Sequence, residues 1–307
     1  MMTERKIEFA IIGAAKSAST WLHLALRQHS AIYMPGTETA FFEDPYYDPH
    51  NLRALHHSVA DAPETSRIGI KCPNYLCTPE CAPRLARHLP DLKMIAILRN
   101  PVDRAISQYY HLIRSGRLPV APADEAFANY LRGHFDPPFA KKLVLDFGCY
   151  GAGIEAFRRQ FPVDQLLILT DLDLAADQQG VFRRACRFIG VSDEFIPPTI
   201  ALPRNQGVYL TSILALIQRL NSLGFTFDSR LGTETLRPGP VPAAARRLAV
   251  LTSRVSAVLR HFVHTQEPEV SQASRSALLR YYLQDIELLE RLTDIDLGEW
   301  KRRPLAN

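Results

Sequence analysis

Residues 9–22, FAIIGAAKSASTWL, constrain the fold more than any other stretch of the chain. The apolar run from Phe9 to Ile12 is typical of a buried parallel strand, and the turn from Gly13 to Ser19 carries almost no side-chain bulk apart from Lys16. After the turn, apolar residues recur at helical spacing: Trp21, Leu22, Leu24, Ala25 and Leu26. A strand that runs through a small-residue turn into a helix presents backbone N–H groups to an anion. The stretch therefore predicts a phosphate cradle.

This turn differs from the nucleotide-triphosphate loop, G-x-x-x-x-G-K-[ST], in an informative way. Counted from Gly13, the second glycine and the lysine of that pattern fall on Ala18 and Ser19, and only Thr20 fits. The lysine of this turn is Lys16, three positions early. A lysine there suits a ligand with one 5′ phosphate-type group better than a triphosphate. The plain alternative is an ordinary strand-to-helix turn with an exposed lysine.

A second stretch, residues 92–110, has the same strand-to-helix character. Residues 94–98 form another apolar run, and Asn100 is a good N-cap for the helix that follows. Arg99 leaves the carboxyl end of the predicted strand, where ligands of open α/β sheets collect. Ser107 lies about two turns into the helix. Arg99 by a bidentate fork and Ser107 by its hydroxyl can bind one phosphate.

Together these two stretches resemble the sulfotransferases that use 3′-phosphoadenosine 5′-phosphosulfate (PAPS). The segment Lys16–Thr20 resembles the family's 5′-phosphosulfate loop, usually K-x-G-T-T, and the segment from Arg99 to Ser107 resembles its 3′-phosphate motif. The chain departs from the first pattern at Ala18 and Ser19, where Gly and Thr are usual. The resemblance implies PAPS as cosubstrate and a cofactor site made of Lys16, Ser17, Ala18, Ser19, Thr20, Trp21, Arg99 and Ser107.

A third segment is similar to the heparan-sulfate branch of this family. Glu38-Thr-Ala-Phe-Phe42 resembles the branch's E-x-x-F-F segment, whose glutamate is the catalytic base, so the resemblance implies that role for Glu38. Lys71 matches the lysine of the branch's E-K-T-P-x-Y segment, although Cys72 replaces the threonine. The implied roles are proton acceptance by Glu38, neutralisation of the leaving oxygen by Lys16 and polarisation of the sulfuryl group by Lys71, with no metal.

The alternation of strand and helix patterns predicts an α/β fold. We expect a P-loop-like parallel sheet flanked by helices, with a helical C-terminal part, in a single domain over residues 1–307. A helical insertion or lid is expected at about 205–262. Within it, residues 243–262 are basic and amphipathic and suit either a lid or an oligomer face, and residues 232–240 are too rich in Gly and Pro for regular structure. The pattern leaves the oligomeric state open.

Composition limits the partners and the compartment. A net charge of +4 suits an anionic cofactor or substrate but is too small to predict nucleic-acid binding. No stretch approaches the roughly 18 apolar residues of a membrane span, and the first strand begins too early for a signal peptide. Five cysteines in a chain of this length suit reduced thiols. These features predict a cytoplasmic protein without stable membrane insertion.

The sequence favours a sulfotransferase whose acceptor hydroxyl or amine belongs to a carbohydrate, a glycosylated metabolite or another small molecule. Two alternatives from other classes stay open at this stage. A P-loop kinase or NTPase would require the glycine–lysine pair that the first turn lacks. A non-catalytic nucleotide-binding module would retain the cradle without turnover. The residues do not identify the acceptor.

Overall fold

The computed structural model describes residues 5–198, 211–228, 234–259 and 270–302. The chain divides into two compact units. The first unit comprises Met1–Asn100, Cys149–Arg204 and Asp285–Leu297, and the second comprises Pro101–Gly148, Asn205–Gln284 and Gly298–Asn307. The expected insertion at about 205–262 therefore belongs to a larger unit that also includes the segment directly after Asn100.

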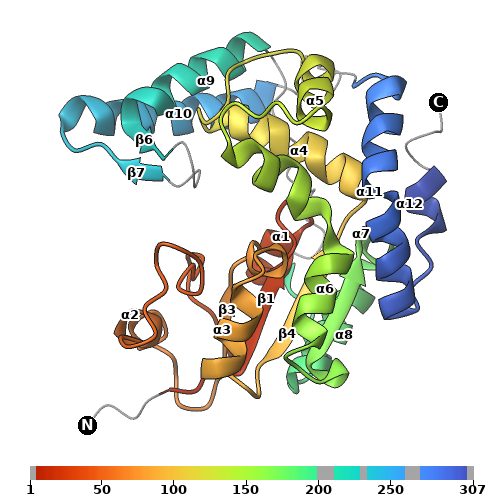
Figure 1. The fold of residues 1–307 in the computed structure, drawn as a ribbon. Coiled ribbons are helices and arrows are strands. Elements are labelled where there is room, and N and C mark those ends of the chain that lie inside the picture. The colour runs from red at the N-terminus through yellow and green to blue at the C-terminus, as the bar shows by residue number, and fades with distance from the viewer. Residues whose placement is uncertain (1–4, 199–210, 229–233, 260–269, 303–307) are drawn as a thin grey trace. The chain divides into compact units, whose positions relative to one another are not determined.

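A five-stranded parallel sheet forms the centre of the first unit, with the strand order β2-β3-β1-β4-β5 (Figure 1). Its strands are β1 (Phe9–Gly13), β2 (Ile32–Tyr33), β3 (Arg67–Lys71), β4 (Lys93–Leu98) and β5 (Leu166–Thr170). Phe9 pairs with Gly69 on one side and with Lys93 on the other. A Cβ atom added at Gly69 would come within 2.2 Å of the Phe9 ring, so this glycine is required for the ring to lie across β3. The predicted α/β fold is confirmed.

Helices cover both faces of this sheet. Phe9, Ile11 and Ile97 pack on one face in a buried cluster with α1 (Ser19–Leu26), α7 (Asp171–Ala176) and α8 (Gln178–Ile189). Figure 1 shows α3 (Cys81–His88) and α6 (Tyr150–Arg158) in front of the sheet. The short elements of this unit are α2 (Arg53–His57), η1 (Tyr75–Cys77) and η4 (Val163–Gln165). Burial on both faces explains why the strands are continuous apolar runs rather than alternating ones.

The second unit is mainly helical. It contains α4 (Pro101–Arg114), α5 (Ala123–Leu131), the π-helix η2 (Lys141–Leu145), η3 (Asp146–Gly148), α9 (Thr211–Gly224), α10 (Pro240–Leu259) and α12 (Gly298–Arg302). Helix α11 (Gln272–Thr293) contributes residues to both units. An antiparallel hairpin of β6 (Phe225–Phe227) and β7 (Glu234–Leu236) joins α9 to α10. The expectation of no regular structure at 232–240 is wrong at Glu234–Leu236, because main-chain pairing with β6 overrides local composition.

Candidate functional site

The predicted phosphate cradle lies between β1 and α1 in the first unit. Lys16 and Ala18 both adopt left-handed backbone conformations, each with φ of 68°. The Ala14 N–H donates to the Ile97 carbonyl of β4 at 2.8 Å, which anchors the start of the turn to the sheet. Ala18 is the N-cap of α1 and provides no side-chain cap. The positive end of the α1 dipole therefore faces this turn without a capping side chain.

Within the part of the chain that the structure describes, Ser17 places a buried hydroxyl without a hydrogen-bond partner in this turn. Its side chain is buried, with an exposed fraction of 3%. Among the residues that the structure describes, its hydroxyl oxygen has no hydrogen-bond partner. Buried hydroxyls are normally satisfied, so an orphaned one within a phosphate-type turn is suited to an oxygen atom of a bound anion.

Two of the predicted catalytic residues, Glu38 and Lys71, contact each other directly. The Lys71 Nζ atom, at the carboxyl end of β3, donates to Glu38 Oε1 at 2.8 Å and to Thr20 Oγ1 at 3.0 Å. The Lys71 side chain is 4% exposed and that of Glu38 is 49% exposed. An ammonium has three N–H donors, so one remains after these two bonds. The pair therefore joins a buried cation to a carboxylate that solvent and solute can reach.

Backbone contacts determine where Glu38 lies. The N–H of Thr39, the next residue, donates to the Lys71 carbonyl at 2.8 Å, which extends the edge of β3 by one bond. The Tyr75 hydroxyl donates to the Thr39 carbonyl. Both Thr39 and Tyr75 are buried. The loop after β2 is thus fixed immediately after Glu38 by the same segment that carries Lys71.

His23 fixes the other side of this loop. It lies on α1, one turn after Thr20, and its Nε2 atom donates to the Pro35 carbonyl at 2.8 Å. The pKa of His23 is lowered to about 4, mainly by burial and to a smaller extent by the nearby Lys71 and Arg27, while the hydrogen bond to Pro35 acts in the opposite direction. The imidazole is therefore neutral at pH 7. The i+3 spacing places His23 on the same face of α1 as Thr20, but nothing in the sequence indicates its contact with Pro35.

Cys72 replaces the threonine of the resembled segment and has a structural partner. Its thiol donates to Glu43 Oε1 at 2.9 Å. Burial raises the pKa of the Cys72 thiol well above its usual range, and the Glu43 carboxylate raises it further. The Glu43 carboxylate also accepts a hydrogen bond from Asn74 Nδ2 at 3.4 Å. Glu43 thus holds the segment after β3 and is distinct in role from Glu38.

Arg99 connects the second predicted motif to the first. It follows β4, and its Nη1 atom donates to the Lys16 carbonyl at 3.5 Å, the upper limit for a hydrogen bond. Arg99 and the first predicted motif thus meet at the carboxyl edge of the sheet in the first unit. Trp21, on α1, is partly buried and packs against the core cluster. Ser107, the other predicted 3′-phosphate residue, is half-buried on α4 of the second unit.

The aromatic pair after Glu38 belongs to the core. Phe41 and Phe42 are 6% and 0% exposed. The Phe42 ring packs edge-on against Tyr75 with a centroid separation of 5.7 Å, and the Phe42 carbonyl accepts a hydrogen bond from Arg84 at 2.9 Å. Sequence reasoning missed this tether because nothing in the spacing of Arg84 indicates a backbone acceptor in a distant loop.

The described part of the chain lacks a metal-type cluster and a membrane-spanning helix. No group of three or more His, Cys, Asp or Glu side chains is arranged to hold a metal ion among these residues. In the same residues, no helix combines the length and the apolar character needed to cross a membrane.

A phosphate-type turn, a lysine–glutamate pair and an arginine at the carboxyl edge of a parallel sheet are typical of α/β proteins that bind phosphate-type ligands. The family model described as "Sulfotransferase family" matches residues 39–195, just over half of the chain. The chain belongs to the sulfotransferase family. The matched segment includes Lys71, Arg99 and Ser107 and begins one residue after Glu38.

Curated relatives come from the heparan sulfate group. The chain is 30% identical to heparan sulfate glucosamine 3-O-sulfotransferase 3B1 of Mus musculus over 184 residues, which cover 59% of this chain and 45% of that protein. It is 31% identical to bifunctional heparan sulfate N-deacetylase/N-sulfotransferase 4 of Mus musculus over 199 residues, 61% of this chain and 23% of that protein. The chain thus spans less than half the length of these relatives.

A solved structure shares the fold over nearly the whole chain. The sulfotransferase from Alicyclobacillus acidocaldarius superposes with a TM-score of 0.64 at 23% identity, covering 97% of this chain and 99% of that one. At this identity the likeness concerns the fold alone.

Proposed function

We propose that this chain transfers a sulfuryl group from PAPS to an acceptor hydroxyl, or amine, by in-line displacement. The observation that carries the proposal is the contact of Glu38 with Lys71 next to Thr20, at the N-terminus of α1. Family membership supports the class of reaction. The pairing of an accessible carboxylate with a buried cation supports acid–base and charge-stabilising roles for these two side chains.

The residues fit a nucleotide that carries a 5′ phosphosulfate and a 3′ phosphate. The orphaned hydroxyl of Ser17 and the N-terminus of α1, which no side chain caps, support binding of the 5′ group. We assign the 3′ phosphate to Arg99 and Ser107, since a guanidinium and a hydroxyl bind phosphate oxygens well. The remaining contacts of the cofactor site are assigned to Lys16, Ala18, Ser19, Thr20 and Trp21.

In this scheme PAPS supplies an activated sulfuryl group. Glu38 accepts the proton of the acceptor as the new bond to sulfur forms. Lys16 neutralises the charge that develops on the departing phosphate oxygen, and the remaining N–H of Lys71 donates to a sulfuryl oxygen. Lys71 therefore both orients the base and stabilises the developing charge.

We propose a carbohydrate as the acceptor class. The named relatives act on heparan sulfate, and the 49% exposed side chain of Glu38 allows approach of a bulky hydroxyl-bearing molecule. Whether an oxygen or a nitrogen atom is sulfated follows from which acceptors support turnover.

The test is release of 3′-phosphoadenosine 5′-phosphate from PAPS by purified protein across a panel of carbohydrate and small-molecule acceptors. With a productive acceptor, Glu38→Gln should lower turnover by about 10²–10⁴ at saturating donor, because a positioned base is lost. The matched control is Glu64→Gln, an exposed glutamate in the same unit, which should retain turnover. A normal rate in Glu38→Gln would refute the assignment.

The same assay separates the two other classes. Turnover of ATP with Mg²⁺ and none of PAPS would indicate a kinase or NTPase. Tight binding of 3′-phosphoadenosine 5′-phosphate without turnover of PAPS by any acceptor would indicate a non-catalytic binding module.

A further inference from the structure

Exposed apolar side chains are concentrated in one part of the second unit. Among the residues whose side chains the structure describes, eleven large apolar side chains are exposed, and seven of them lie between Leu216 and Leu251. They belong to α9, the β6–β7 hairpin and α10: Leu216, Leu223, Leu236, Val241, Leu248, Val250 and Leu251. Such a concentration is uncommon on a surface that faces only water.

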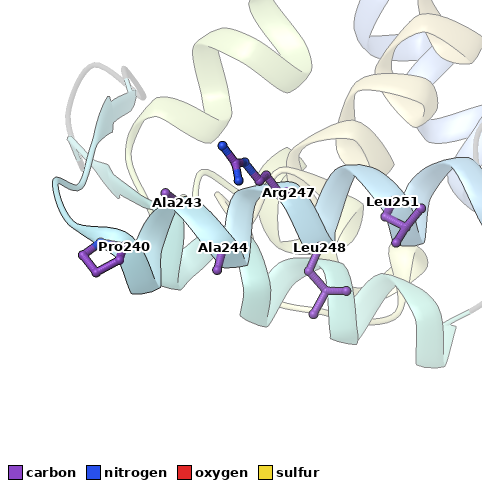
Figure 2. Close-up of a pocket in the computed structure, with 6 residues that line it drawn as sticks. All are labelled: Pro240, Ala243, Ala244, Arg247, Leu248 and Leu251. Atoms are coloured by element: carbon purple, nitrogen blue, oxygen red, sulfur yellow. The ribbon is translucent and has the colours of Figure 1, made fainter.

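On α10 three of these side chains, Val241, Leu248 and Leu251, form a stripe, and Val250 lies on another side of the helix. Its buried side, which includes Ala245 and Ala249, packs within the unit, where α10 lies against α9. The opposite side presents Leu248 and Leu251, which are 49% and 56% exposed. A surface groove of about 570 Å³ runs along this side and is lined by Pro240, Ala243, Ala244, Arg247, Leu248 and Leu251 (Figure 2).

The charge of the same helices has one sign. Neither α9 nor α10 contains an Asp or a Glu, whereas Arg219 on α9 and Arg247 on α10 are exposed. Arg246 is used within the unit, where it donates to the Gly224 carbonyl at 2.9 Å and to the Arg237 carbonyl at 3.0 Å. Arg247 lines the same groove as Leu248 and Leu251, and Figure 2 shows its side chain on the other side of α10 from that of Leu248.

We propose that the surface formed by α9 and α10 docks onto an anionic lipid membrane. Exposed leucines with an interspersed arginine and no acidic residue match an acyl-chain boundary that lies beneath anionic headgroups. A soluble polyanion would pair with the arginines and leave the leucines in water. A two-fold contact with a second copy would bring Arg247 onto the same arginine-bearing face, with no carboxylate from α9 or α10 to neutralise it.

Docking of this kind requires no membrane-spanning segment. Arg247 lines the same groove as the apolar stripe, and none of the described helices can cross a bilayer. The inference is independent of the proposed reaction, because none of the residues in this surface is assigned to the cofactor or to catalysis.

The test is flotation of the full chain with vesicles of equal parts phosphatidylglycerol and phosphatidylcholine, compared with vesicles of phosphatidylcholine alone. We expect binding to the anionic vesicles, weakened by salt. Leu248→Gln with Leu251→Gln should weaken binding at least about tenfold, because two inserting side chains are lost. Arg247→Gln should weaken it about fivefold.

Matched controls are Val163→Gln and Arg183→Gln, which alter an exposed apolar and an exposed basic side chain in the first unit and should leave vesicle binding unchanged. Thermal unfolding checks that each variant is folded. No binding to anionic vesicles, or equal binding to both vesicle types, would overturn the proposal. So would dimerisation in solution that the Leu248 and Leu251 substitutions abolish, or preferential retention on a sulfated polysaccharide that does not depend on these leucines.

Discussion

The end of β3 in the first unit and the first turn of α4 in the second each bury a cation, and the two cations have different partners. Lys71 donates to the side chains of Glu38 and Thr20, and Glu38 is half exposed. Arg104 is 0% exposed and donates to the backbone carbonyls of Leu143 and Val144 in the π-helix η2. A buried cation that bonds only to backbone oxygen holds the chain together. One that faces an accessible carboxylate keeps its charge within reach of a substrate.

This comparison can be tested first at Arg104. We expect Arg104→Met to lower the free energy of unfolding by about 3–5 kcal/mol, since two buried carbonyls lose charge-assisted hydrogen bonds of about 1.5–3 kcal/mol each. Urea denaturation measures the change. Arg132→Met, at an exposed arginine in the same unit, is the control and should unfold like the unaltered chain. An unaltered urea denaturation midpoint in Arg104→Met would show that Arg104 does not stabilise the fold.

Substitution of Lys71 should give the opposite pattern. Lys71→Met is expected to reduce turnover of PAPS by about 10²–10³, because a donor to the developing charge is lost. Its free energy of unfolding should change by only about 1 kcal/mol, since the half-exposed Glu38 carboxylate can be solvated by water. The control is Lys6→Met, whose ion pair with Asp91 is on the surface. Loss of stability in proportion to activity would make Lys71 a structural residue like Arg104.

The pH dependence of the free energy of unfolding tests whether His23 is buried as a neutral side chain in the folded protein. Its pKa is about 4 in the folded chain and about 6.5 when unfolded. The unfolded state therefore binds more protons between these values, and stability falls as the pH decreases from about 6.5 to about 4. His23→Gln removes this titration, so the difference between the two stability curves should vary with pH in that window. Parallel curves from pH 7 to pH 4 would contradict it.

The smallest effect is expected at Ala18, whose φ of 68° favours glycine. Ala18→Gly should raise the free energy of unfolding by about 0.5–1 kcal/mol through relief of the left-handed conformation. Ala15→Gly, in the same turn but without a positive φ, is the control and should be destabilising. Thermal or urea unfolding distinguishes the two signs. Destabilisation by both substitutions would mean that the Ala18 conformation carries no cost.

The sheet and the cluster at its edge were predictable for a physical reason. Buried parallel strands leave continuous apolar runs, and residues that follow such strands meet at one edge, as Lys16, Lys71 and Arg99 do. The partner of Lys71 was less accessible to sequence reasoning. The resemblance indicated Glu38, but the contact depends on a main-chain bond from Thr39 to Lys71, which leaves no side-chain signature.

Other features depend on contacts between distant segments and were not predicted. The strand Glu234–Leu236 forms because β6 offers a partner, although its flanking residues favour a loop. Arg104 shares a helix with the predicted phosphate residue Ser107, yet its guanidinium is taken by carbonyls of η2, about forty residues later in the chain. Periodicity reports which face of a helix is apolar and carries no information on which backbone oxygen a buried arginine will bind.

The bonds around Glu38 also govern where this chain can change in length. His23 holds Pro35, and Lys71 and Tyr75 hold Thr39, so only three residues lie between the two attachments. An insertion there moves the carboxylate away from Lys71. Residues 48–51, farther along the same loop, are exposed and bonded only to near neighbours. Added or deleted residues at that position change the exposed part of the loop while Glu38 stays beside Lys71, so the length of this loop can vary without disturbing the Glu38–Lys71 pair.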